Sequence, residues 1–157
     1  GSAAWFFSGT NCSISTNFNY GTTDGVQLTH FNQGQTPPGG FISQSFQTIN
    51  GQTYVLQFDY GAFSAPNVTS QQRMRATVVG NTTLLDQTVS INAPGNGSRY
   101  MPASFTFIGD GSNVTLTLKD VSTTTDSVDL LLDNVRVSLQ NAPTIATQPQ
   151  SRPSPPL

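Results

Sequence analysis

Apolar and polar residues alternate with a period of two along most of this chain, and this pattern limits the fold more than any other feature. In the segment 53–60, Tyr54, Leu56 and Phe58 share one face, while Gln57 and Asp59 share the other. Such alternation is typical of strands that bury one side. The same period marks 26–30, 41–48, 73–78, 84–91, 104–108, 114–118 and 128–139. The sequence predicts an all-β fold, a β-sandwich of about eight antiparallel strands with jelly-roll connections.

Turn-forming residues separate these segments and suggest how the chain is organised. Because Asn50-Gly51 is a strong signal for a tight turn, we interpret 41–48 and 53–60 as the strands of a hairpin. From Asn141 onward the pattern is lost, and the last 16 residues contain five Pro. We therefore expect a jelly-roll module over 1–140, followed over 141–157 by a Pro-rich linker or extended tail.

Composition excludes several classes of protein. Only 9% of the 157 residues are charged, with eight Asp, no Glu and a net charge of −2. Six dispersed cations do not predict a nucleic-acid-binding face. No apolar run is long enough for a membrane span. The single cysteine, Cys12, can form neither a disulfide within the chain nor a structural zinc cluster. A surface rich in Thr, Ser, Asn and Gln favours an extracellular or cell-surface location.

Four motifs stand out along the chain, which are Asp24-Gly25, ISQSF at 42–46, NGQTY and FDY within 50–60, and LDNVRV at 132–137. Together they resemble motifs of galactose-binding-like jelly-roll modules from bacterial extracellular proteins. The resemblance covers 20–139 and implies a jelly-roll fold. Its members include carbohydrate-binding modules attached to polysaccharide-degrading enzymes, and cell-surface domains. Relatives usually begin with a strand of the type NGxFE, which this sequence lacks, and the tail resembles the lead into an immunoglobulin-like domain.

The sequence carries no pattern typical of catalysis. A glycosidase needs a pair of carboxyl groups, one on each side of the bond it cleaves. The spacing of the eight Asp along the sequence does not indicate such a catalytic pair. His30 is the only histidine, and no G-x-S-x-G motif supplies a nucleophile for it. We therefore expect a protein that is not an enzyme, with His30 an ordinary strand residue.

Carbohydrate binding is the function we expect first. Sugars stack their C–H faces on exposed aromatic rings, while polar side chains bind the hydroxyl groups. The candidates for this role are the aromatic residues Trp5, Tyr20, Tyr60, Phe63 and Tyr100, with Arg73, Arg75 and Gln57 as polar walls. The alternative is that Trp5, Tyr60 and Tyr100 belong to the core, and that both arginines lie on an ordinary solvated face.

Asp133 is a candidate metal ligand. It is in phase with Leu131, Val135 and Val137, and a buried carboxylate needs a hydrogen-bonding partner or a cation. In similar jelly rolls the matching Asp helps to hold a structural Ca²⁺, so the resemblance implies calcium here, with Asp24 as a second ligand. The alternatives are a β-bulge at Asp133-Asn134, a carboxylate capped by backbone N–H groups, and a simple turn at Asp24-Gly25.

A second function from a different class is a structural subunit of an extracellular fibre or surface layer. A jelly roll that lacks its first strand leaves an open edge, and such an edge can pair with another chain. We expect the tail 142–157 to be able to supply that strand to a neighbouring copy, as in donor-strand complementation.

Overall fold

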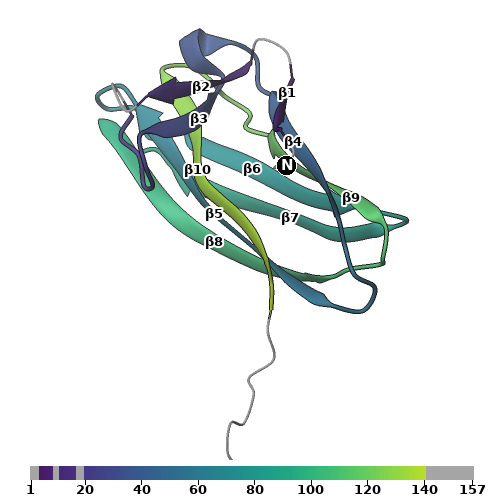
Figure 1. The fold of residues 1–157 in the computed structure, drawn as a ribbon. Coiled ribbons are helices and arrows are strands. Elements are labelled where there is room, and N and C mark those ends of the chain that lie inside the picture. The colour runs from purple at the N-terminus through teal and green to yellow at the C-terminus, as the bar shows by residue number, and fades with distance from the viewer. Residues whose placement is uncertain (1–3, 9–10, 17–19, 141–157) are drawn as a thin grey trace, which may run out of the picture.

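The computed structural model describes residues 4–8, 11–16 and 20–140, which form two five-stranded sheets packed face to face (Figure 1). Sheet I has the strand order β1-β4-β9-β6-β7, and sheet II has the order β2-β3-β10-β5-β8. All of the strand pairings are antiparallel. A membrane-spanning helix, long and apolar enough to cross a bilayer, is absent from the described residues.

The strands of sheet I are β1 (Phe6–Phe7), β4 (Phe41–Gln47), β9 (Asn113–Asp120), β6 (Gln71–Val79) and β7 (Thr83–Asn92). Those of sheet II are β2 (Cys12–Thr16), β3 (Gln27–Phe31), β10 (Val128–Leu139), β5 (Thr53–Ser64) and β8 (Gly97–Ile108). The prediction of an all-β jelly-roll sandwich is confirmed, with ten strands in the described part of the chain. The two strands that the alternation did not mark are β1, which has two residues, and β2, in which Ile14 is exposed.

The chain passes from one sheet to the other at most connections, and this corrects the predicted hairpin. Strand β4 lies in sheet I and β5 in sheet II, so 41–48 and 53–60 do not pair. A type I′ hairpin turn needs positive φ at both central residues, but only Gly51, with φ 77°, has it. The connection bonds elsewhere instead, because the backbone N–H of Gly51 donates to the carbonyl of Gly109 at 2.8 Å.

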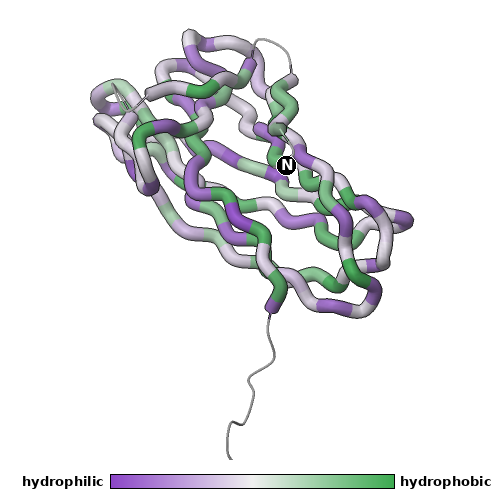
Figure 2. The backbone as a smooth tube through the Cα atoms, viewed as in Figure 1, coloured by the Kyte–Doolittle hydropathy of each residue, from purple (hydrophilic) through white to green (hydrophobic). Residues whose placement is uncertain are grey.

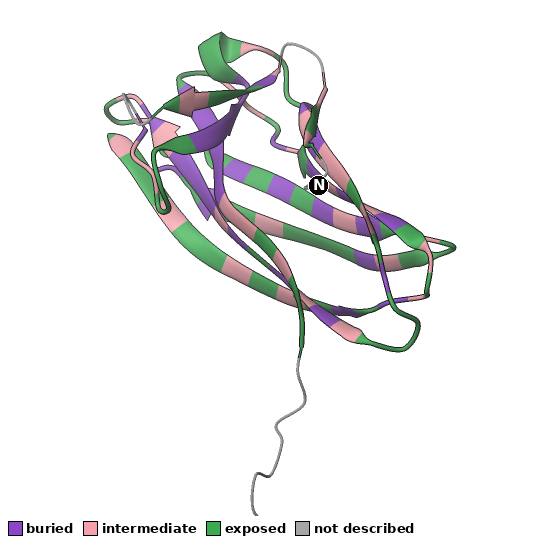
Figure 3. Ribbon diagram, viewed as in Figure 1, coloured by how far each residue is buried: buried purple, intermediate pink, exposed green. Residues whose placement is uncertain are grey.

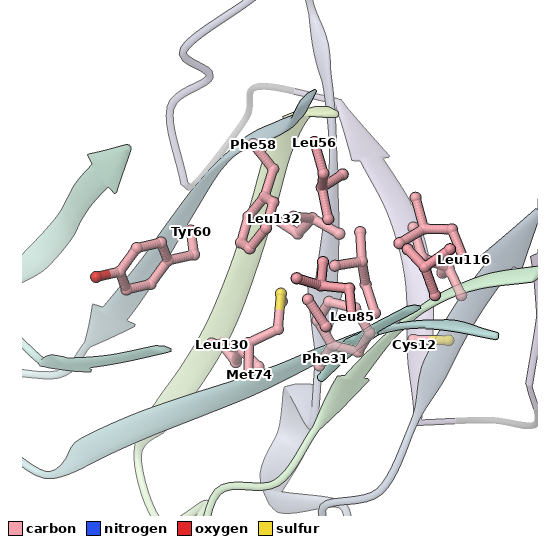
Figure 4. Close-up of a cluster of buried hydrophobic side chains, with 14 of the residues drawn as sticks. Cys12, Phe31, Leu56, Phe58, Tyr60, Met74, Leu85, Leu116, Leu130 and Leu132 are labelled. Carbon is pink, nitrogen blue, oxygen red and sulfur yellow. The ribbon is translucent and has the colours of Figure 1, made fainter. Parts of the chain in front are cut away.

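The core lies between the sheets and follows the alternation. Figure 2 shows apolar and polar residues in turn along the strands, and Figure 3 shows buried and exposed bands along β6. In β6 the side chains of Met74, Ala76 and Val78 are buried, while Arg73 and Arg75 are exposed. Sheet II contributes Leu56, Phe58, Leu130 and Leu132 to the same cluster (Figure 4). Burial of this apolar surface is the main force that holds the two sheets together.

Strand β10 is buried on both faces over its first half. All six residues from Val128 to Asp133 are buried, and Leu131 and Leu132 are 0% and 1% exposed although they point to opposite sides. A β-bulge follows, because three steps from Asp133 to Arg136 match two steps from Asp59 to Gln57 on β5. The extra residue changes which side faces the core, from Leu130 and Leu132 before it to Val135 and Val137 after it.

A second, smaller cluster explains why Leu131 is buried on the outer side of sheet II. It consists of Tyr20, Leu28 and Leu131, with the half-buried Phe63 and Tyr100 packed against them. The hydroxyl of Tyr100 donates to the carbonyl of Gly21 at 2.7 Å, which ties the segment 20–25 to β8. Tyr20 therefore anchors this segment in a small second core outside the sandwich.

Truncation of either leucine tests whether β10 is buried on both sides. We expect Leu131→Ala and Leu132→Ala each to lower the free energy of unfolding by about 2–5 kcal/mol, because both leave a cavity. Leu139→Ala is the matched control and should cost less than about 1 kcal/mol, since Leu139 is 44% exposed. Urea denaturation measures all three, and a small effect at Leu131 would contradict the second core.

Candidate functional site

The fold does not bring the predicted aromatic residues together on one platform. Tyr60 is 7% exposed and lies in the main core beside Phe58 and Leu132 (Figure 4). The expectation that it offers an exposed ring does not hold, because β5 is an inner strand of sheet II and Tyr60 points between the sheets. Trp5 is half-buried and packs on the edge of the same core.

Phe63, Tyr20 and Tyr100 do come together, in the second cluster on sheet II. The rings of Tyr20 and Phe63 meet edge to face with centroids 5.1 Å apart. The hydroxyl of Tyr20 donates to Oδ2 of Asp129 at 2.9 Å, and burial raises the pKa of this tyrosine well above its usual value. Tyr20 is 4% exposed, so it serves as a support for Phe63 and offers little surface of its own.

A pocket of about 220 Å³ lies beside Phe63, where three connections of the fold meet. Its lining residues are Gly34, Gln35, Phe63, Ala65, Thr125, Ser127 and Asp129. The half-buried ring of Phe63 supplies an apolar surface, and a carboxyl, an amide and two hydroxyls surround it. This combination of one flat ring and several hydrogen-bonding groups suits a small polyhydroxylated ligand.

Burial and backbone geometry both mark this pocket as unusual. Asp129 is 9% exposed, and its desolvation raises the pKa of the carboxyl group, although the Tyr20 hydroxyl acts in the opposite direction. Gln35 and Ser127 have φ of 63° and 58°, a left-handed conformation that non-glycine residues seldom adopt. Strained backbone of this kind is concentrated at functional sites.

Arg73 and Arg75 lie far from these aromatics in the fold, on the outer face of sheet I. Both are exposed, as the alternation predicts. The guanidinium of Arg75 pairs with Asp86 of β7, with Nε donating to Oδ1 at 2.7 Å. The pKa of Asp86 is lowered by the hydrogen bonds from this guanidinium. Gln57, the third predicted polar wall, is exposed on sheet II and lines a separate pocket with Asp59 and Arg136.

Asp133 is buried, as predicted, and its carboxylate is surrounded by hydrogen-bond donors. Oδ2 accepts from the backbone N–H groups of Thr23 and Asp24 at 2.7 and 3.1 Å, and from the Thr23 hydroxyl at 3.2 Å. Oδ1 accepts from the N–H of Asn134 at 2.7 Å. Asp133 thus fastens the segment 20–25 to β10, and the bulge at Asp133-Asn134 is also present.

These surroundings do not fit the calcium ion that the resemblance implied. An N–H group cannot ligate a cation, and Oδ2 of Asp24 instead accepts from the Arg136 guanidinium at 3.0 Å. Across the described residues, no group of three or more His, Cys, Asp or Glu side chains could hold a metal ion. Calcium binding stays a prediction, which metal titration tests.

Asp133→Asn separates the two accounts of this carboxylate. If Asp133 acts as a hydrogen-bond acceptor, the amide cannot accept all four bonds, and the unfolding free energy should fall by about 1.5–3 kcal/mol. Calcium or EDTA should then leave the melting temperature of the unmodified protein unchanged in calorimetry. A calcium-dependent rise in melting temperature that Asp133→Asn abolishes would support the metal instead.

An apolar groove of about 560 Å³ runs along the side of the sandwich between β4 and the second half of β10. The apolar lining of the groove includes Trp5, Phe46, Tyr54, Val137 and Leu139. Strand β3 pairs with β10 only over Leu130–Leu132, so β10 has no partner strand on that side beyond Leu132 among the described residues. The tail 142–157, predicted to donate a strand, lies outside the described residues.

The fold is that of carbohydrate-binding modules. A structure described as "CBM4 structure and function" aligns with a TM-score of 0.56 and 20% identity, covering 87% of this chain and 86% of that one. A family 35 carbohydrate-binding module from Clostridium thermocellum aligns with a TM-score of 0.57 and 17% identity, covering 87% and 94%. TmCBM61 in complex with β-1,4-galactotriose gives 0.57 and 10%, covering 87% and 88%.

No protein-family model matches the sequence, and no curated protein matches it. At identities of 20% or less, the structural alignments establish the jelly-roll sandwich and leave the ligand open.

Four polar residues of the pocket were not anticipated from the sequence. They are Gln35 on the β3–β4 connection, Thr125 and Ser127 on the β9–β10 connection, and Asp129 near the start of β10. Gln35 and Asp129 are more than 90 residues apart along the chain. Runs such as VSTTTDS at 121–127 show no period, so nothing in them indicates which hydroxyl faces a pocket. Only Phe63 was predicted for this site.

Proposed function

We propose that this chain is a non-catalytic carbohydrate-binding module of an exported or cell-surface protein, with the pocket at Phe63 as its binding site. The observation that carries the proposal is the lining of that pocket. It joins one accessible aromatic ring to a carboxyl, an amide and two hydroxyls on a rigid sandwich. The shared fold with carbohydrate-binding modules supports the same conclusion.

The proposed mechanism needs little movement of the protein. A sugar ring stacks its C–H face on Phe63, whose ring is held by the edge-to-face contact with the buried Tyr20. Asp129 accepts a hydrogen bond from a sugar hydroxyl, while Thr125 and Ser127 can either donate or accept. Because Tyr20 holds Phe63 and Asp129 in place before binding, little conformational entropy is lost at these two residues. The pocket volume of about 220 Å³ suits one sugar unit or the end of a chain.

Phe63→Leu tests the stacking step, since leucine keeps much of the apolar volume but has no flat ring. We expect the affinity for a bound oligosaccharide to fall by about tenfold, which corresponds to about 1.4 kcal/mol. Isothermal titration calorimetry measures it, after a panel containing β-1,4-galactotriose, xylohexaose and panose has identified a binder. Unchanged affinity in Phe63→Leu would contradict this site.

Two further variants make that result interpretable. Phe105→Leu is the matched control, because Phe105 of β8 packs against the main core and is not among the residues lining the pocket. It should leave the affinity unchanged even if it lowers stability. Thr125→Ala removes one hydroxyl from the pocket wall and should weaken binding without a loss of stability, since Thr125 is only half-buried.

The second candidate function is assembly into a fibre or surface layer by strand donation through the tail 142–157. The observation that favours it is the apolar groove beside β10, where Val135 to Leu139 could pair with an added strand. The tail offers a Pro-free run of five residues, 144–148, for this role.

Deletion of 142–157 tests this second function. If the tail of one copy fills the groove of the next, light scattering should find large assemblies of the full chain and monomers of the deleted chain. A Leu139→Asp variant, which places a charge at the groove, should also be monomeric. Monomers in the full chain at high concentration would contradict strand donation and leave the carbohydrate-binding proposal untouched.

A further inference from the structure

The cations of this chain are not dispersed once it is folded. Arg73 and Arg75 of β6 and Lys119 of β9 all project from the outer face of sheet I, and they are three of the five cations in the described residues. On β1, β4, β9, β6 and β7, the outward positions carry one carboxylate, Asp86. This face therefore has an excess of positive charge in a chain whose net charge is −2.

The register of the strands concentrates this charge further. Arg75 and Lys119 lie directly opposite each other across the β6–β9 pair. Like charges in this position repel each other and destabilise a sheet. Arg75 is partly neutralised by Asp86, and the other ion pair among the described residues is Arg136–Asp24 on sheet II. Arg73 and Lys119 are thus left without a carboxylate partner in the described part of the chain.

The outward side of sheet II carries more carboxyl groups than cations. Asp59, Asp129 and Asp133 occupy outward positions, although Asp129 and Asp133 are buried beneath neighbouring segments. Asp24 lies on the segment packed over this sheet and pairs with Arg136. Positive and negative groups are thus separated onto two faces, although mixing them would lower the repulsion within each face. Such separation guides the approach of a charged partner and selects its sign.

The cations stand among groups that suit a sugar chain. Phe41 lies opposite Lys119 in the β4–β9 register, and its ring meets that of Phe6 with centroids 6.0 Å apart. Phe6 is 60% exposed, so its ring is open to a stacking partner. Hydroxyls lie beside the cations on the same face, at Ser43, Thr77, Thr88, Thr115 and Thr117.

We propose that the outer face of sheet I binds an acidic polysaccharide, whose carboxylate or sulfate groups pair with Arg73, Arg75 and Lys119. Residues two apart on a strand are separated by about 7 Å, and neighbouring strands by about 5 Å. The three cations thus lie close enough to meet successive charged groups of one chain. Phe6 and the hydroxyl rows contact the sugar rings between those groups. The inference rests on the proposed carbohydrate-binding function but uses a different surface from the Phe63 pocket.

A nucleic acid fits this face less well than an acidic sugar chain. Binding to a phosphate backbone depends on many neutralised phosphates, and three cations supply few of these contacts. The serine and threonine rows offer donors and acceptors across a flat surface, which matches the hydroxyls of a sugar chain. Single-stranded DNA is nevertheless included in the test as a competing polyanion.

The experiment compares Arg73→Gln/Lys119→Gln with Arg99→Gln/Arg136→Gln, a control with the same change in net charge made on sheet II. Both pairs are exposed, so the variants should fold, which their melting temperatures check. Calorimetry with polygalacturonate, dextran sulfate, neutral dextran and single-stranded DNA measures binding at low and physiological salt. We expect the first variant to lose roughly five- to tenfold in affinity for an acidic polysaccharide, as expected for two exposed ion pairs.

The outcomes separate this inference from the proposed function. Preference for polygalacturonate or for dextran sulfate supports it and identifies carboxylate or sulfate as the recognised group. An equal loss in the control variant, or equal binding of DNA, would overturn it, because the effect would then be one of charge alone. If neutral oligosaccharides bind in a Phe63-dependent manner while acidic polymers do not bind, the inference fails and the carbohydrate-binding function stands.

Discussion

The bulge at Asn134 determines how sheet II is built. Asn134 has φ 55° and adds one residue to β10, so that Val135 and Val137 turn toward the core and Arg136 toward solvent. A regular strand would aim Arg136 into the sandwich, where an unpaired guanidinium is very costly. Asparagine tolerates this conformation better than most residues, and its Nδ2 donates to Oδ2 of Asp59 at 3.1 Å. The bulge therefore joins the first half of β10, which is buried on both faces, to the second half, which packs on the core with one face only.

The candidate pocket depends on this arrangement through a chain of contacts. Asp133, at the start of the bulge, holds the backbone of Thr23 and Asp24, and these residues anchor the segment 20–25 over sheet II. Tyr20 begins that segment and supports both Asp129 and Phe63. A substitution in β10 near Asn134 would thus shift Tyr20 and, through it, the two pocket-lining residues Phe63 and Asp129. Asp133 and Tyr20 themselves do not line the pocket.

The sequence predicted the sandwich because its core strands bury one side, as in β6, where Met74, Ala76 and Val78 alternate with polar residues. The prediction from the sequence failed where a strand does not bury one face and expose the other. The first half of β10 is buried on both sides, so Asp133 shares a face with Leu131 but not with Val137 beyond the bulge. The Asn50-Gly51 turn was misread because the turn signal does not say whether the chain stays in one sheet. The pocket was largely missed because contacts between Phe63, Gln35 and Asp129 are set by the tertiary fold.

The same limit explains how a chain with few charges acquires a cationic face. In the sequence, Lys119 stands more than 40 residues from Arg73 and Arg75, and six cations look dispersed. Antiparallel pairing of β6 with β9 places Lys119 opposite Arg75, so the register creates the charge density that composition hides. A polysaccharide long enough to contact both this face and the Phe63 pocket would bind each of them at a high effective concentration once the other is occupied. Two weak surfaces on one rigid sandwich can then hold a polymer more tightly than either surface holds a short oligosaccharide.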